Sequence, residues 1–329
     1  MNYQALVVFE ENKKFVRRIV SRKLEELPAG DVLIRVRYSS LNYKDALSAT
    51  GNKGITRNYP HTPGIDAAGI VETSSDNSFR IGDEVLVTGY DLGMNTAGGY
   101  SELIKVPADW IVPKPSSFSL KECMILGTAG FTAATALYKL QCMGQSVSAG
   151  PVVVTGATGG VGSLAVALLS NAGYEVIGVT GKSNANTYLL SLGAKEIQPR
   201  SFVNDVSGKS LIKPKWAAAI DTTGGTILET LLKGCMQEGN IVSTGLVASP
   251  NLSTTVYPFI LNGVSLLGVG SAGMPMDVRR IIWEKLAGEW NIQSRLPSIG
   301  KEVTLSELNE KYIDEILAGR ITGRIVVKI

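Results

Sequence analysis

Histidine and cysteine are scarce in this chain, and their scarcity excludes most metal chemistry. His61, in the turn-like stretch YPHTPG, is the single histidine, and the three cysteines, Cys123, Cys142 and Cys235, are scattered with no C-x-x-C spacing. A tetrahedral zinc site needs about four nitrogen, sulfur or oxygen ligands, so we expect no metal site. The odd number of cysteines also argues against a disulfide framework and favours small buried side chains, as expected for a cytoplasmic protein.

Long apolar runs and strong charge are also missing. No stretch reaches the roughly 18 uninterrupted apolar residues of a membrane helix, and Glu10 and Glu11 interrupt the apolar residues at the N-terminus early, which argues against a signal peptide. The formal net charge is +3 without a run of Lys or Arg, which is too little for a nucleic-acid-binding surface. We therefore expect a small-molecule partner, and neither a membrane nor a nucleic acid.

The remaining composition is that of a globular protein with two domains. Hydrophobic residues make up 44% and charged residues 19% of 329 residues, enough for two sizeable cores. Residues 1–110 contain short β-type runs separated by turns, which predict a mainly β domain that is partly barrel-like. From about residue 120, strands alternate with helices, which predicts α/β structure with a doubly wound parallel sheet. The alternation weakens beyond about residue 255, where the chain is expected to return to the first domain.

These patterns give domain boundaries and individual elements. We predict one domain from residues 1–120 and 260–329, and a second from residues 121–259. A capping box, with Ser119 as the N-cap and Glu122 three residues later, marks the start of the second domain. Within it we predict strands over 151–156, 174–181, 195–199, 216–224 and 239–246, and helices over 162–173, 184–194 and 226–236.

The stretch VTGATGGVG, residues 154–162, carries the strongest chemical signal. Glycines 156, 159, 160 and 162 follow a β-branched run and precede an apolar helix, with a second strand beyond. In this context a glycine loop lets the backbone approach a pyrophosphate at a helix N-terminus. The spacing departs from the simple G-x-G-x-x-G pattern, but its place in a strand-helix-strand unit predicts a dinucleotide site.

The end of the second strand indicates which dinucleotide binds. NAD enzymes usually place an acid there for the ribose 2′-hydroxyl, whereas this strand ends in Thr180, Gly181 and Lys182. A 2′-phosphate is better served by hydroxyl donors and a cation. Arg200 follows the third strand and could reach the same phosphate, so we predict NADP(H).

Several motifs together resemble a known superfamily. SSLNYKDALSATG, PGIDAAG, AGGYSELIKVP, GTAGFTAA, YPFILNGVSLLG and GRIVVKI, added to the glycine loop, extend over essentially the whole chain. The set resembles the medium-chain dehydrogenase/reductase superfamily, and within it the zinc-free quinone-oxidoreductase branch and the YhdH/YhfP-type acrylyl-CoA reductase group. The resemblance implies a Rossmann domain and a GroES-like catalytic domain. Zinc-dependent relatives carry a Cys ligand where this chain has LNYKD and a His-Glu pair where it has Ile65 and Asp66.

The resemblance also implies site residues. Asn42, Tyr43 and Asp45 are the catalytic candidates, with Tyr43 along the cofactor in the cleft and its hydroxyl able to donate to an enolate. The positions that match the family's cofactor contacts are Tyr43, Thr128, Thr158, Gly159, Gly160, Val161, Thr180, Gly181, Lys182, Arg200, Leu246, Ile260, Ser271 and Arg324. Among these, Thr128 would begin the helix at the domain junction, Leu246, Ile260 and Ser271 would line the nicotinamide end, and Arg324 would be a cation on the cofactor side.

We therefore expect a zinc-independent reductase that transfers hydride from NADPH to an activated double bond or a quinone. Acrylyl-CoA is the acceptor that the family suggests, and NADPH:quinone oxidoreduction is the alternative. A nucleotide-binding protein without turnover is a further alternative, from a different class. Members of the family usually form homodimers, so the resemblance also implies a homodimer. Relatives often carry Arg in place of Lys182 and of Asn262. If the Arg at position 262 helps those relatives to hold a phosphorylated substrate, its replacement by Asn262 puts the recognition of CoA by this chain in question.

Overall fold

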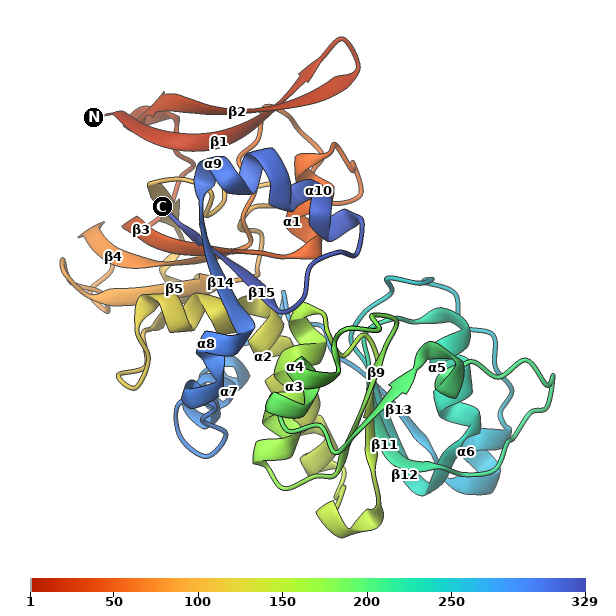
Figure 1. The fold of residues 1–329 in the computed structure, drawn as a ribbon. Helices are drawn as coiled ribbons and strands as arrows, with labels where there is room; N and C mark the ends of the chain where they lie inside the picture. The colour runs from red at the N-terminus through yellow and green to blue at the C-terminus, as the bar shows by residue number, and fades with distance from the viewer. Residues whose placement is uncertain (1) are drawn as a thin grey trace. The chain divides into compact units, whose positions relative to one another are not determined.

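The computed structural model describes residues 2–329, and the chain divides into two compact units. The first unit runs to Thr128 and resumes over Ser271–Ala287 and Leu296–Ile329, and the second contains Ala129–Gly270 and Gly288–Arg295. Each unit has its own sheet, and each is described here by itself (Figure 1).

The first unit is mainly β. Its strands are β1 (Asn2–Glu11), β2 (Lys14–Lys23), β3 (Val32–Leu41), β4 (Asp66–Ser74), β5 (Glu84–Thr88), β6 (Leu103–Val106), β7 (Ile111–Pro113), β14 (Gly300–Thr304) and β15 (Arg324–Lys328). β1 and β2 form an antiparallel hairpin, and the others form a seven-stranded sheet in the order β14-β15-β3-β4-β5-β7, with β6 also paired to β3. Val32, Ile34 and Val36 are buried in one apolar cluster, because alternate residues of a strand face the same side.

The first unit also contains helices, most of them short. They are α1 (Tyr43–Ala49), α7 (Met276–Ala287), α8 (Leu296–Ile299), α9 (Leu305–Glu307) and α10 (Ile313–Leu317). α1 packs against α10, so that Ala46 and Ala49 are buried with Ile313 and Ile325 in a common core. The C-terminal residues therefore support the helix that begins at Tyr43.

A long helix, α2 (Leu120–Cys142), continues from the first unit into the second. The predicted capping box is confirmed, because Ser119 N donates to Glu122 Oε2 over 2.8 Å and Glu122 N donates to Ser119 Oγ over 3.2 Å. Gly127 interrupts the helix with φ +48° and ψ −154°. By length and composition α2 could cross a membrane, although we expected no such stretch, but 83% of its apolar window is buried inside the protein, as in a core helix.

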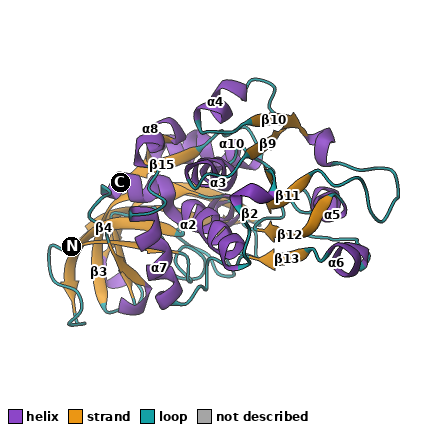
Figure 2. Cartoon of the chain, turned by 90° about the horizontal axis from the view of Figure 1, so that it is seen from below, coloured by secondary structure: helices purple, strands orange, loops and turns teal. Residues whose placement is uncertain are grey.

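The second unit confirms the predicted doubly wound parallel sheet. Its strands are β8 (Val152–Val154), β9 (Val176–Thr180), β10 (Glu196–Pro199), β11 (Trp216–Asp221), β12 (Cys235–Ser243) and β13 (Ser265–Gly268), and its helices are α3 (Gly160–Asn171), α4 (Asn186–Ser191), α5 (Gly225–Lys233) and α6 (Tyr257–Asn262). The strand order is β10-β9-β8-β11-β12-β13, and every pair is parallel. Because right-handed crossovers leave β8 and β11 in opposite directions, α3 and α5 cover opposite faces (Figures 1 and 2).

Two details of the second unit differ from the sequence-based expectation. Residues 260–270 were assigned to the first domain, but β13 pairs along its whole length with β12, which keeps them in the second unit. The helix predicted over 226–236 ends earlier, since β12 begins at Cys235, which pairs with Trp216. A register shift and a positive φ of 57° at Glu238 let β12 continue past this irregularity.

Candidate active site

The glycine-rich loop joins β8 to α3, and close backbone contacts require its glycines. Gly156 has φ +56°, and a Cβ there would lie 2.3 Å from Thr222 Oγ1. A Cβ at Gly162 would lie 2.2 Å from the carbonyl oxygen of Gly156. Gly159 is the N-cap, so Gly160 and Val161 begin α3, and N–H groups in the first turn of a helix have no partner within it. This loop has the geometry that binds a phosphate.

The residues predicted to select the 2′-phosphate lie together at the ends of β9 and β10. Thr158 Oγ1 and Thr180 Oγ1 are 3.2 Å apart, and Thr180 Oγ1 accepts a hydrogen bond from Lys182 N over 3.1 Å. The guanidinium of Arg200 lies against Gly181, where a Cβ would be 2.7 Å from Arg200 Nε. Burial lowers the pKa of Lys182, as expected for a cation taken partly out of water. Two cations and two hydroxyl groups thus lie next to the glycine loop.

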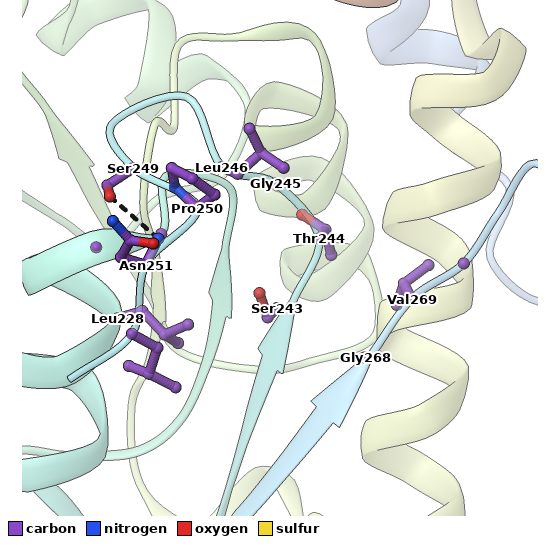
Figure 3. Close-up of a pocket in the computed structure, with 14 residues that line it drawn as sticks. Leu228, Ser243, Thr244, Gly245, Leu246, Ser249, Pro250, Asn251, Gly268 and Val269 are labelled. Atoms are coloured by element: carbon purple, nitrogen blue, oxygen red, sulfur yellow. Dashed lines mark hydrogen bonds between the residues drawn. The ribbon is translucent and has the colours of Figure 1, made fainter. Parts of the chain in front are cut away.

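A cavity of about 500 Å³ lies at the carboxyl ends of the next strands. Figure 3 shows its residues where the arrows of β12 and β13 end, at Ser243 and Gly268. Its lining residues are Gly224, Gly225, Leu228, Ser243, Thr244, Gly245, Leu246, Ser249, Pro250, Asn251, Leu252, Gly268, Val269 and Gly270, none of which is charged. Dinucleotides bind across the carboxyl edge of such a sheet, with one half on each side of the switch point between β8 and β11. An uncharged cavity on the second side suits a nicotinamide and its ribose.

The three residues predicted to line the nicotinamide end have different positions. Leu246 lines the cavity. Ile260 does not line it: its side chain lies on α6 and is 68% exposed. Ser271 is the first residue of the segment that returns to the first unit, and its carbonyl oxygen accepts a hydrogen bond from Arg279 Nη2 over 3.0 Å.

In the first unit, the predicted catalytic residues Asn42 and Asp45 are occupied by internal hydrogen bonds. Asp45 is completely buried, and its carboxyl group accepts from Asn42 N over 2.8 Å, Asn42 Nδ2 over 3.1 Å and Ile65 N over 2.8 Å. The Asn42 amide also donates to Asp66 Oδ2 over 2.8 Å and accepts from Arg324 Nη1 over 3.0 Å. These side chains fix the start of α1, and the catalytic roles predicted for Asn42 and Asp45 stay predictions.

Asp66, which was not among the predicted site residues, is the centre of this network. Its carboxylate accepts from Ser40 Oγ over 2.6 Å and from Thr128 through both the hydroxyl, over 2.6 Å, and the backbone N–H, over 3.0 Å. Thr128 follows the break in α2, so Asp66 caps the second half of that helix. The only signal in the sequence was the acid in GIDAAG, at the position where zinc-dependent relatives carry Glu.

Arg324, predicted to be a cation on the cofactor side, lies in the buried network of the first unit. Its side chain is buried and donates to the carbonyl oxygens of Ile125, over 3.1 Å, and Leu41, over 3.0 Å, and to Ser40 Oγ over 2.7 Å. Its Nη2 lies 3.7 Å from Asp66 Oδ2. The guanidinium therefore balances buried carboxyl groups inside the first unit.

The network carries more acid than base. One guanidinium, Arg324, is buried with two carboxyl groups, Asp45 and Asp66. Burial and the charge of Asp66 raise the pKa of Asp45 to about 7, and burial raises the pKa of the nearby Tyr100 hydroxyl well above its usual value. A proton on Asp45 removes the excess negative charge, which is costly away from water.

Tyr43 is the catalytic candidate that remains accessible. It is the first residue of α1, its side chain is 38% exposed, and its hydroxyl has no hydrogen bond to another residue of the range 2–329. The hydrogen bonds of Asn42, Asp45 and Asp66 hold the N-terminus of α1, the helix that Tyr43 begins. Among the described residues, no group of three or more His, Cys, Asp or Glu side chains could hold a metal ion.

The comparisons with known proteins agree with this fold. The GroES-like domain family of alcohol dehydrogenases matches residues 28–116, and the family described as zinc-binding dehydrogenase matches residues 160–287. A GroES-like domain joined to a doubly wound nucleotide-binding fold defines the class: the chain is a medium-chain dehydrogenase/reductase.

Similar proteins and solved structures show to which family within this superfamily the chain belongs. YhfP of Bacillus subtilis, whose name refers to quinone oxidoreduction, is 46% identical over 305 residues, which are 93% of this chain and 92% of that protein. The acrylyl-CoA reductase AcuI of Ruegeria pomeroyi is 41% identical over 329 residues, 99% of each chain. The structure of the YhdH oxidoreductase of Salmonella enterica with NADP has a TM-score of 0.96 at 41% identity over 99% of both chains, and that of YhfP with NAD has 0.97 at 44% over 100% of both. The chain belongs to the family of YhfP, AcuI and YhdH, whose members are named as oxidoreductases and reductases.

Proposed function

We propose that this protein is a zinc-independent, NADPH-dependent reductase that transfers hydride to an activated double bond, with acrylyl-CoA as the leading acceptor. The observation that carries the proposal is the Arg200 guanidinium against Gly181 at the end of β9, with Lys182 next in the chain and its backbone N–H bonded to Thr180. A 2′-phosphate needs such cations, and an NAD site would usually have an acid there. The identity to an acrylyl-CoA reductase along the whole chain supports the choice of acceptor.

Each group of residues has one task in this proposal. Bound NADPH supplies the hydride. Thr158 and the loop residues Gly159, Gly160 and Val161 bind the pyrophosphate, and Thr180, Lys182 and Arg200 bind the 2′-phosphate. The uncharged cavity beside Leu246 holds the nicotinamide half, and Thr128 and Ser271 stay predicted contacts of that half.

Tyr43 is the proposed group that meets the acceptor. Hydride addition to an enoyl thioester leaves negative charge on the carbonyl oxygen, and a hydroxyl donor aimed at that oxygen stabilises it. Tyr43 is 38% exposed and its hydroxyl has no hydrogen bond among the described residues, so the hydroxyl can donate to that oxygen and then pass a proton to the enolate. Asn42, Asp45 and Asp66 act as positioning residues through the start of α1.

Quinone reduction is the second candidate, because the site has few cations for CoA. Lys53, which follows α1, is paired with Glu10 over 2.6 Å and lies over the ring of Tyr59. Asn262, where relatives often carry Arg, ends α6 without adding a charge. A quinone needs no phosphate contact, and its reduction also develops charge on an oxygen. The YhfP name gives this candidate its support from the relatives.

We also propose a cytoplasmic homodimer. Large exposed apolar side chains gather on one stretch of the second unit, namely Leu246, Val247, Leu252, Val256, Tyr257, Ile260, Leu261 and Leu266. β13 is an edge strand, paired with β12 in the sheet that the described residues form. Such an edge beside an apolar surface suits pairing with a second copy of the chain. Sedimentation equilibrium tests this directly, and a monomer at micromolar concentration would contradict it.

The first experiment is NADPH oxidation by the purified protein, followed by nicotinamide absorbance. Acrylyl-CoA and 1,4-benzoquinone are compared as acceptors, and NADH replaces NADPH as the control for the 2′-phosphate. We expect saturable turnover with acrylyl-CoA well above that with the quinone, and with NADPH well above NADH. Turnover with the quinone alone would favour the second candidate. Tight binding of NADPH without turnover would leave a nucleotide-binding protein.

A further inference from the structure

Asp221 is a buried carboxylate at the last position of β11 that the proposed site does not use. Its side chain is completely buried. Oδ1 accepts from Thr155 Oγ1 over 2.6 Å and from Thr223 through Oγ1 over 2.7 Å and N over 3.1 Å, and Oδ2 accepts from Gly224 N over 2.8 Å. A carboxylate with this many donors holds the groups around it firmly, since a lost partner would leave a buried charge exposed to apolar surroundings.

On one side, this segment holds the start of the glycine loop. Thr155 follows β8 directly and precedes Gly156. Thr222 N donates to Thr155 Oγ1 over 3.0 Å, and Thr222 Oγ1 donates to the Thr155 carbonyl oxygen over 2.9 Å. The backbone turn at Gly156 therefore rests against Thr222, which is why a Cβ at Gly156 would lie 2.3 Å from Thr222 Oγ1.

On the other side, the same segment holds the walls of the cavity. Thr244 donates to the Asp221 carbonyl oxygen through its N–H over 2.8 Å and its hydroxyl over 2.9 Å. Ala248 N donates to the carbonyl oxygen of Thr223 over 2.8 Å. Thr244, Leu246 and Ser249 belong to the loop that Figure 3 shows around the cavity.

We propose that Asp221 is a positioning residue for the cofactor: it fixes the glycine loop and the nicotinamide cavity at one spacing, so that a single dinucleotide fills both. The inference rests on the proposed NADPH site and extends it to a residue that touches neither half of the cofactor. Two linked halves gain affinity from each other only when both subsites can be filled at once. Loosening the link should therefore weaken the binding of the whole dinucleotide, while the binding of its adenosine half alone stays unchanged.

The test compares two ligands on matched variants. Thr155→Val removes the hydroxyl that joins β8 to Asp221, at nearly constant side-chain volume. Asp221→Asn replaces one of the two carboxylate oxygens, which together accept four hydrogen bonds, by an amide group that can only donate. Thr135→Val is the control, because Thr135 is equally buried in the second unit and donates only to the carbonyl oxygen of Phe131 within α2, over 2.7 Å. Calorimetric titration gives the dissociation constants of NADPH and of adenosine 2′,5′-bisphosphate, which carries both phosphates of the adenosine half.

We expect Thr155→Val and Asp221→Asn to raise the dissociation constant of NADPH about tenfold, the size of one lost hydrogen bond to a charged group. The constant for adenosine 2′,5′-bisphosphate should stay within about twofold, and Thr135→Val should change neither. In steady-state kinetics KM for NADPH should rise while KM for the acceptor does not. Should Asp221→Asn fail to fold, Thr155→Val decides the matter.

Two other results would overturn the inference in distinguishable ways. Equal weakening of both ligands, or no weakening of either, would show that Asp221 supports only the local fold, and the NADPH site would stand. A wild-type protein that binds neither ligand would remove the proposed function itself and the inference with it.

Discussion

At the scale of single residues, the proposed catalytic group is the Tyr43 hydroxyl, carried by a helix whose start is held by buried polar groups. Tyr43→Phe removes that hydroxyl without touching those buried groups. We expect kcat with acrylyl-CoA to fall about 100-fold, the usual size of a lost proton donor, with little change in NADPH affinity or stability. The control is Tyr257→Phe, because Tyr257 is also a partly exposed first residue of a helix. An undiminished kcat in Tyr43→Phe would mean that solvent supplies the proton.

At the scale of elements, the break in α2 connects the helix to the buried network. A Cβ at Gly127 would lie 2.6 Å from Asp66 Oδ2 and 2.9 Å from Ser40 Oγ. Gly127→Ala combines a strained backbone with overpacking, so we expect it to lower the free energy of unfolding by about 3 kcal/mol. Gly319→Ala is the control, because Gly319 has φ +67° but nothing within 4 Å of a Cβ, and it should cost about 1 kcal/mol. Urea unfolding measures both variants, and equal losses would contradict the role given to the network.

Elements are also the scale at which sequence reasoning worked best. The strand Val152–Val154, the glycine loop and α3 could be predicted because their signals are local: a β-branched run, glycines and an apolar helix in sequence. The cluster around Gly181 could be predicted because parallel strands end at one edge. The hydrogen-bond network of Asn42, Asp45 and Arg324 could not, because it depends on partners such as Asp66 that lie far away in the sequence. The same holds for Asp221, whose link to Thr155 spans 66 residues.

At the scale of the whole molecule, the response to pH combines groups with opposite behaviour. Burial and the nearby charge of Asp66 raise the pKa of Asp45 to about 7, from an ordinary value of 3.8. Its contribution to stability is therefore present at low pH and is lost as the pH rises through about 7. His61 behaves in the opposite way, because burial lowers its pKa below the usual 6.5, and its Nε2 has no hydrogen-bond partner. Its contribution is present above pH 6.5 and is lost as the pH falls through the lowered value.

Because His61 is the single histidine of the chain, its pH-dependent contribution to the free energy of unfolding can be measured separately. In His61→Leu the group no longer titrates, so the change in packing gives an offset that does not depend on pH. We expect the wild-type protein to lose stability relative to His61→Leu as the pH falls from about 8 to about 5, because only the wild-type unfolded state takes up a proton at this position. Urea unfolding at each pH gives the difference, and the lone histidine ring signal in a proton NMR titration gives the folded pKa independently. A folded pKa at or above 6.5, or a difference in stability that is constant with pH, would contradict the burial of a neutral ring at this position.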